Sequence, residues 1–112
     1  MAANPVIESS ATARAITEGI AASIRIAEAA LARVRIEGNE GQAERWRGYL
    51  DVLVGADVAL GAQPAYVIVD RCARYAHSHE CALRLSRPCV WRQLMERTGR
   101  QEAIRQLWRL CS

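Results

Sequence analysis

Apolar residues in the first third of the chain recur at alternating steps of four and three residues, the spacing that places side chains on one face of an α-helix. Two such stripes can be followed. The first consists mostly of bulky residues, flanked by Ile24 and Leu31: Ile16, Ile20, Ser23, Ala27, Ala30 and Val34. The second consists mostly of small residues: Ala15, Gly19, Ala22, Ile26, Ala29, Arg33 and Ile36. Because the stripes lie on separate faces, the pattern predicts a helix that is apolar on two sides.

This first helix is predicted to be long. Asn4 is a suitable N-cap and Pro5 a suitable first residue, while a later start lies at Ser9. The helix can run to Glu37, where the sequence GNEG ends it. About 30 residues at a rise of about 1.5 Å each would reach about 45 Å. The segment 1–9 is expected to be flexible where the later start is used.

A helix that is apolar on two sides needs partners on two sides. The bulky stripe suits the core of the domain, and the small stripe suits the close approach of another helix. That helix can belong to a second copy of the chain or to the same chain, and we weigh the two equally. The residues predicted for self-association are Ala15, Ala22, Ile26, Ala29 and Ile36.

The second helix is predicted to begin at Asn39, with Gln42 placed to complete a capping box. The sequence GAQP, residues 61–64, ends this helix. Its apolar residues again follow helical spacing, so they are assigned to a face that packs on the core. They are Ala43, Trp46, Leu50, Leu53, Ala56 and Leu60.

The third helix is predicted from Pro64 to about Ser86. Its first residues, AYVIV, are β-branched enough for a strand, but the helical periodicity continues through Leu83 and favours a helix. Its apolar face is expected to hold Ile68, Cys72, Tyr75, Ala76, His79 and Leu83. Its polar face is expected to hold Asp70, Arg74, His77, Cys81 and Arg84.

The last third of the chain predicts two shorter helices. Pro88 stands in the first turn of a fourth helix, whose apolar stripe is Val90, Trp91, Leu94 and Met95. A helix that continued through Gly99 would turn the next stripe to the opposite side, so we predict a break there. A fifth helix then places Ala103, Ile104, Leu107 and Cys111 inward. Residues 1–112 are thus predicted to form one all-α domain, a homodimeric bundle of four to five helices.

Composition adds little about function. All fifteen basic residues are arginine, and the net charge is +3. The arginines are concentrated in the second half of the chain, which could meet an acidic partner or nucleic acid, although a solvated basic face is the simpler interpretation. The start of the sequence does not resemble a signal peptide, and no apolar run is long enough to span a membrane. We therefore expect a cytoplasmic protein with reduced cysteines at Cys72, Cys81, Cys89 and Cys111.

The histidines and cysteines between residues 72 and 89 raise the question of a metal site. On a helix His77 and His79 point in nearly opposite directions, so they cannot bind one ion together. His79 is expected to be a core histidine, whereas His77 and Cys81 lie one turn apart on the polar face. Zinc would need two more ligands, from Cys89, Cys111 or a second chain, and the cysteine spacing matches no standard zinc pattern. We expect no metal and no other cofactor.

Two further classes of function are weighed and not favoured. Cys81 beside His77 could act as a nucleophile, but neither an oxyanion donor motif nor an orienting third group is identifiable, so we do not expect an enzyme. The predicted helix pair in residues 91–109 loosely resembles a helix-turn-helix. Met95 and Arg105 stand where that motif usually has small or apolar residues, so direct DNA binding is not favoured.

As a whole the chain resembles the QslA-type antiactivators of bacterial quorum sensing, which are small and helical. The resemblance lies in the Ala/Ile opening ATARAITEGIAASIRIAEAALARVRIEG, the segment ERWRGYLDVLVGADVALG and the Arg/Trp ending QEAIRQLWRLCS. It implies a non-enzymatic inhibitor that binds a LuxR-type transcriptional activator, on its ligand-binding domain, and blocks its dimerisation or DNA binding.

Large aromatic residues are the natural candidates for contact with such a partner. Aromatic side chains and arginine dominate the energetics of protein interfaces. Tyr66, Trp91 and Trp108 are therefore the predicted partner-binding residues. The alternative for each is a place in the core, and we expect at least two of the three to be buried there.

Overall fold

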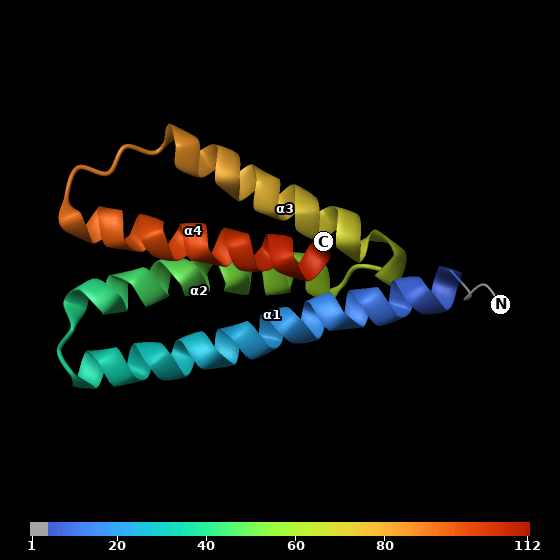
Figure 1. Ribbon diagram of the computed structural model, residues 1–112, viewed down its shortest axis with the longest axis horizontal. Coiled ribbons are helices and arrows are strands. Elements are labelled where there is room, and N and C mark those ends of the chain that lie inside the picture. The colour runs from blue at the N-terminus through green and yellow to red at the C-terminus, as the bar shows by residue number, and fades with distance from the viewer. Residues whose placement is uncertain (1–4) are drawn as a thin grey trace.

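The protein, described here by a computed structural model, is an elongated bundle of four helices (Figure 1). The structure describes the backbone of residues 5–112 and the side chains of residues 10–112. The helices are α1 (Pro5–Ile36), α2 (Glu40–Gly61), α3 (Ala65–Leu85) and α4 (Trp91–Cys111). The bundle measures 54 × 31 × 23 Å. The predicted all-α fold with a long first helix is confirmed; the predicted N-cap Asn4 lies outside the described residues.

The turn between α1 and α2 forms as the sequence predicts. Gly38 has a φ of +73°, a left-handed conformation that glycine adopts without steric cost. Asn39 then caps α2, because its Oδ1 accepts a hydrogen bond from the backbone N–H of Gln42 at 3.1 Å. The other half of the predicted capping box does not form: the Asn39 N–H donates to the carbonyl of Val34, and Gln42 Oε1 accepts from Arg45. At the next boundary Pro64 precedes α3, and the β-branched residues that follow it are helical, as predicted.

The bulky stripe of α1 faces the interior and forms one side of the core, which confirms its assignment. The main core lies where all four helices meet: Ala13, Ile16, Ile20, Val52, Leu53, Ala56, Leu60, Ile68, Cys72, Ala76, Ala103, Ile104 and Leu107. Nearer the α1–α2 turn there is only a small cluster, in which α1 packs on α2 alone: Leu31, Val34, Ala43, Trp46 and Leu50. The two clusters divide the bundle into a well-filled end and a thin end.

Helices α2 and α4 cross so closely that no side chain fits between them at the point of contact. A Cβ atom on Gly99 would lie 1.7 Å from the carbonyl oxygen of Arg45, and one on Gly48 would lie 2.1 Å from that of Glu96. Both glycines are buried. The two helix backbones therefore touch at this crossing, and glycine is the residue that leaves room for the contact.

The same crossing explains why the predicted break at Gly99 is wrong. A glycine inside a helix costs about 1 kcal/mol relative to alanine, so it is a reasonable signal for a helix end. Here the glycine marks the close packing of α2, and α4 runs without interruption from Trp91 to Cys111. The described chain therefore has no separate fifth helix.

Because α4 is continuous, its two apolar stripes point in opposite directions. Ala103, Ile104 and Leu107 are buried, as predicted. Val90, Trp91 and Leu94, which belong to the stripe predicted for a fourth helix, are exposed. They lie at the start of α4, with Val90 as its N-cap residue, and we refer to the three as the α4 tip.

Candidate protein-interaction surface

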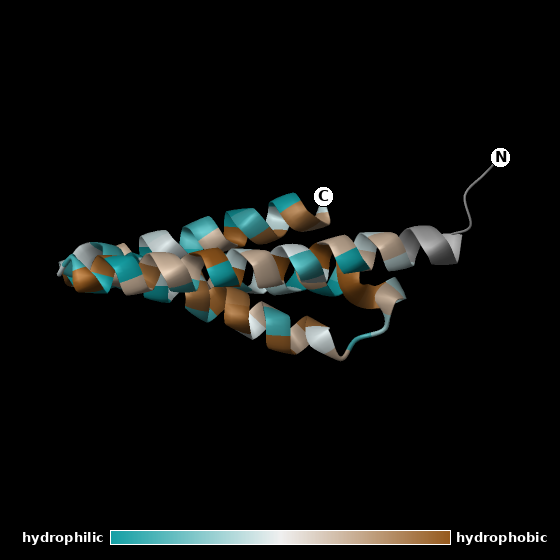
Figure 2. Cartoon of the chain, turned by 90° about the horizontal axis from the view of Figure 1, so that it is seen from below, coloured by the Kyte–Doolittle hydropathy of each residue, from teal (hydrophilic) through white to brown (hydrophobic). Residues whose placement is uncertain are grey.

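The small-residue side of α1 is largely uncovered. We call its predicted self-association residues the outer stripe: Ala15, Ala22, Ile26, Ala29 and Ile36. Ile26 is 67% exposed and Ile36 is 89% exposed, while Ala22 alone among the five is partly buried. Figure 2 views the bundle from the side of α1 and shows apolar turns interspersed with polar ones along this helix. The outer stripe is therefore free to contact another molecule; whether it mediates self-association stays a prediction.

One position on this side of α1 is covered by the chain itself. A Cβ atom on Gly19 would lie 2.5 Å from Cδ2 of Leu110, so the end of α4 packs directly on α1 there. Packing within the chain, one of the two outcomes weighed for this face, therefore occurs at Gly19, and contact with a second copy stays a prediction. The open part runs from Ile26 to Ile36.

A groove of about 650 Å³ adjoins Ile26, between α1, α2 and α4. The rings of Trp46 and Tyr49 pack edge to face there, with their centroids 5.5 Å apart. The remaining lining residues are polar or charged: Ser23, Arg45, Thr98, Gln101, Glu102, Arg105, Gln106 and Arg109. An aromatic surface bordered by hydrogen-bonding groups resembles the composition of protein interfaces.

The charged groups of this groove are paired with one another. Arg45 donates from Nε and Nη2 to the two carboxylate oxygens of Glu102, at 2.5 and 2.7 Å. The hydrogen bond to Glu102 raises the pKa of Arg45 against the opposing effect of burial. For Tyr49 burial acts in the other direction and raises the pKa. Gln106 Nε2 donates to Ser23 Oγ at 3.2 Å and links α4 to α1. The network links the side chains of α1, α2 and α4 that line the groove.

The three predicted aromatic anchors do not form one site. Tyr66 is 78% exposed in the first turn of α3, and Trp91 is 53% exposed in the first turn of α4. These two turns lie at opposite ends of the bundle (Figure 1). Trp108 is partly buried and packs against the main core. The expectation that at least two of the three belong to the core is therefore wrong, because only Trp108 does.

Trp91 is held in place although it is exposed. A Cβ atom on Gly41 of α2 would lie 3.6 Å from Cζ3 of the Trp91 ring, so the ring rests against the first turn of that helix. The guanidinium of Arg92 lies 5.5 Å from the ring centroid, and Arg92 Nη2 pairs with Glu40 Oε2 at 2.9 Å. These contacts fix the ring of the α4 tip before any partner arrives.

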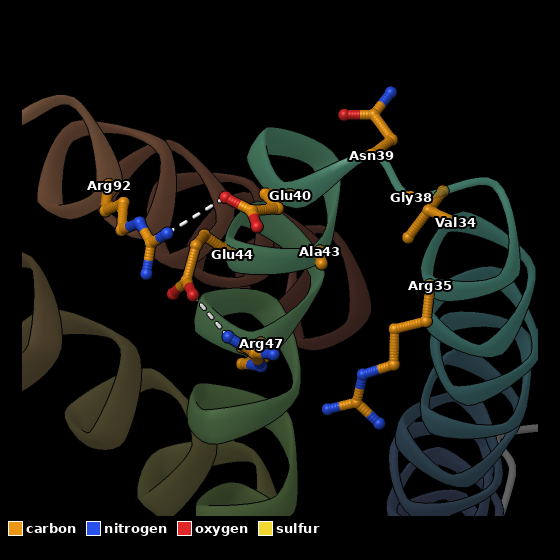
Figure 3. A pocket seen from close by; sticks show the side chains of 9 residues that line it. All are labelled: Val34, Arg35, Gly38, Asn39, Glu40, Ala43, Glu44, Arg47 and Arg92. Carbon is orange, nitrogen blue, oxygen red and sulfur yellow. Dashed lines mark hydrogen bonds and ion pairs between the residues drawn. The ribbon is translucent and has the colours of Figure 1, made fainter.

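A smaller cleft of about 270 Å³ lies beside the α1–α2 turn (Figure 3). Three arginines and two glutamates line it. Glu40 pairs with Arg92 and Glu44 with Arg47, and Figure 3 shows Arg35 reaching into the same space from α1. The acidic side chains neutralise much of the arginine charge, so the cleft does not resemble a phosphate site.

The face of α3 that carries histidine and cysteine differs from its prediction in one respect. His77 Nε2 and Cys81 Sγ lie 3.6 Å apart on the polar face, as expected. His79 is only partly buried, so it is not the fully buried core histidine that the sequence predicts. Its ring packs on that of Tyr75, with the two ring centroids 4.4 Å apart. Burial lowers the pKa of His79, and the positive charge of Arg100 lowers it further.

The other cysteines lie in varied surroundings. Cys72 is fully buried, and burial raises the pKa of its thiol to about 12, with a further contribution from the neighbouring Cys111. Cys89 is exposed between α3 and α4. Within the described part of the chain, histidine, cysteine and acidic residues form no group of three or more that could bind a metal ion.

The helix-turn-helix weighed as an alternative for residues 91–109 does not form. Residues 91–109 belong to one helix, so the helix pair of a helix-turn-helix is not present. Arg92 and Arg100 are engaged with acidic residues of α2, at Glu40 and Asp51. Two of the five arginines of α4 therefore form ion pairs that join it to α2.

No family model matches the chain, and no curated protein or solved structure is significantly similar to it. Within residues 5–112, no helix has the length and apolar character needed to cross a membrane.

Two features of the surface are not predicted from the sequence. Trp91 is a predicted contact residue, but the opposite orientation of the two stripes of α4 is not expected, because the pattern predicts a break at Gly99. The groove beside Ile26 was not foreseen because Trp46 was assigned only to the core face and Tyr49 to no face. The signal that could have revealed both is the pair Gly48 and Gly99, each set among residues with helical periodicity, where a close helix crossing is the alternative to a helix end.

Proposed function

We propose that this protein is a non-enzymatic inhibitor that acts by binding another protein, and that it acts in the cytoplasm as a homodimer. Its partner is a LuxR-type transcriptional activator, bound through the ligand-binding domain and thereby kept from dimerising or from reaching DNA. The observation that carries the proposal is the exposure of the outer stripe, with Ile26 and Ile36 open to solvent on a helix whose other side is fully used by the core.

The energetics support an interaction role for this face. Burying a large aliphatic side chain lowers the free energy by about 1.5–3 kcal/mol. A partner that covers the two exposed isoleucines would therefore bind with a substantial hydrophobic contribution. An amphipathic helix that packs along α1 would contact residues spaced by three and four positions. The small residues Ala22 and Ala29 allow such a helix to come close.

The two apolar surfaces suit different tasks. The outer stripe is straight and repetitive, which suits the same stripe of a second copy across a two-fold axis. The α4 tip presents a preorganised tryptophan flanked by Arg92, the combination that most often anchors foreign partners. Trp91 is therefore the favoured contact with the regulator, Tyr66 is a second candidate, and Trp108 is occupied by the core.

The proposal is tested by mixing the full chain with the ligand-binding domain of a LuxR-type activator and measuring mass by light scattering and affinity by calorimetry. A stable complex whose affinity varies little with salt is expected. Trp91→Ala should weaken it by at least about tenfold, the effect of a lost anchor of about 1.4 kcal/mol. Absence of a complex with several such domains would reject the assigned partner.

Self-association has its own matched pair of variants. Ile26→Arg places a charge in the outer stripe, whereas Glu28→Arg places an arginine at an exposed position of α1 whose neighbours three and four residues away all lie outside that stripe. Only Ile26→Arg should turn a dimer into a monomer. A wild-type chain that is monomeric at high concentration would contradict the homodimer directly.

Salt dependence separates this function from nucleic-acid binding. A protein that binds phosphates releases counterions, so its affinity falls steeply as salt increases. If the chain bound duplex DNA with such a slope and bound no regulator domain, the proposed function would be replaced by direct DNA binding.

A further inference from the structure

His77 and Cys81 have the separation of two ligands of one metal ion. The distance from His77 Nε2 to Cys81 Sγ is 3.6 Å. Zinc binds imidazole nitrogen at about 2.0–2.1 Å and thiolate sulfur at about 2.3 Å, and at a tetrahedral angle these lengths put the two ligand atoms about 3.5–3.6 Å apart. The two side chains lie one helical turn apart on α3, so an ion can be bound without any movement of the backbone.

The chemistry of the pair selects the kind of ion. A thiolate and an imidazole favour zinc and similar borderline or soft ions over magnesium or calcium, which prefer oxygen. His77 is exposed and Cys81 is partly exposed, so an ion has direct access from solvent. When zinc binds, the Cys81 thiol releases its proton to solvent as the sulfur–zinc bond forms, and no change of oxidation state occurs.

The local charge permits such an ion. The arginine one turn before His77, Arg74, is paired with Asp70 at 3.0 Å, so its charge is largely balanced. Glu80 and Arg84 flank the pair on the same helix, one of each sign. No uncompensated cluster of positive charge therefore surrounds the two ligands.

Two ligands do not complete a structural zinc site, which takes four. Within the described residues no third histidine, cysteine or acidic side chain joins this pair. We infer that His77 and Cys81 form half of a zinc-class site, and that the same two residues of a second copy of the chain supply the other half. A two-fold axis through the ion gives two thiolates and two imidazoles, a neutral and tetrahedral set.

This metal-bridged contact runs through α3 and is separate from the outer stripe of α1. It does not depend on the proposed function. If both contacts are isologous, a chain with zinc has two different two-fold interfaces, which build either a closed tetramer or a longer assembly. Zinc would therefore control the size of the assembly and not the fold.

The test uses the full chain, stripped with a chelator and kept reduced by a reductant that does not bind metal, and titrated with zinc alone. Competition with a coloured chelator gives the stoichiometry, and light scattering gives the mass. One zinc per two chains and a mass at least twice that of the metal-free protein are expected. One zinc per chain with no change in mass, or no zinc binding, would reject the shared site.

The Ile26→Arg variant keeps the two contacts apart. With the outer stripe disabled, zinc should convert a monomer into a dimer and nothing larger. If zinc has no effect on the mass of this variant, the α3 contact is wrong whatever the state of the α1 contact. If Ile26→Arg has the same mass as the parent chain without metal, and zinc still doubles the mass of the variant, the result supports the α3 site and rejects the α1 interface.

Ligand variants identify the binding atoms. Losing even an outer partner of a metal ligand typically weakens binding about 10–100-fold, so Cys81→Ser and His77→Ala should each weaken zinc binding by about 100-fold or more. Cys89→Ser removes an exposed thiol elsewhere and should leave binding unchanged. All three positions are on the surface, and circular dichroism checks that the helices are intact. Zinc binding that survives Cys81→Ser, or is lost in Cys89→Ser, would overturn the assignment.

Cobalt(II) provides a spectroscopic readout of the same site. It should give the absorption of a tetrahedral ion together with a sulfur-to-metal charge-transfer band, and the band should vanish in Cys81→Ser. An octahedral spectrum with no sulfur contribution would show that the ion is bound elsewhere.

Discussion

The two ends of the bundle bury their apolar residues to very different degrees. At one end α1 meets α2, α3 and α4 around the main core, where Leu53 and Leu107 are completely buried. At the other end α3 has diverged from α1 (Figure 1), and α1 packs on α2 alone. There Ile36 and Trp91 face solvent. The comparison indicates that the well-filled end carries most of the stability of the fold, while exposed apolar side chains occur at both ends, among them Val58 and Tyr66 at the well-filled end.

The sharpest test of this contrast removes one large apolar side chain from each end. Leu53→Ala creates a cavity in the main core and should lower the free energy of unfolding by about 2–5 kcal/mol. Leu94→Ala, at the exposed α4 tip, should change it by less than about 0.5 kcal/mol. Urea unfolding followed by circular dichroism measures both. Equal losses in the free energy of unfolding would show that the two ends contribute equally to the stability of the fold.

The helix crossing between the two ends predicts the next largest effect. Gly99→Ala forces a methyl group against the backbone of α2 and should cost about 1–3 kcal/mol, although alanine is the better helix former. Gly61 has open space around it, so Gly61→Ala should be neutral or slightly stabilising. Thermal or urea unfolding compares the two, and a stabilised Gly99→Ala would show that the helices are not in contact there.

A smaller effect is expected from the ion pair that joins α2 to α4. Arg45→Ala removes two charge-assisted hydrogen bonds to Glu102 and should cost about 1.5 kcal/mol. The control is Arg74→Ala, because the Arg74–Asp70 pair is largely exposed and should contribute no more than about 0.5 kcal/mol. If the two variants lose the same free energy of unfolding, the Arg45–Glu102 pair contributes no more to stability than an exposed ion pair within one helix.

The smallest effect is a dependence of stability on pH through His79. Its pKa is lowered in the folded chain by burial and by Arg100, while Asp51 opposes the shift. The unfolded state therefore takes up this proton first as pH falls through about 6.5, so the contribution is present above that pH and is lost below it. Urea midpoints at about pH 7.5 and about pH 5.5 should differ less in His79→Gln than in the parent chain.

Helix periodicity accounts for most of the fold that the sequence predicts. The bulky stripe of α1 is buried at Ile16 and Ile20 as expected, and the cap at Asn39 forms as predicted. Both depend on local spacing and local hydrogen bonds, which a single sequence contains. The exposure of the outer stripe at Ile26 follows from the same spacing, because one helix in a small bundle cannot pack on two opposite sides along its whole length.

The errors arise where long-range packing decides between two local choices. At Gly99 the sequence permits either a helix end or a close crossing, and only the position of Gly48 on α2 selects the second. That choice turns Trp91 and Leu94 to the side of α4 opposite to Ala103 and Leu107, where both are exposed. The location of Tyr66 and Trp91 at opposite ends depends in the same way on how α3 and α4 are arranged in space, which their local patterns do not contain.

The contact between the backbones at Gly48 and Gly99 has a consequence for reading any future survey of variants. No larger residue fits at either position without pushing α2 and α4 apart, so a screen that selects functional clones should find both glycines almost unchanged. Ile26, which can tolerate many replacements without harm to folding, should change freely unless association is selected. Intolerance to substitution will therefore mark the crossing of α2 and α4 more strongly than the surface that binds a partner.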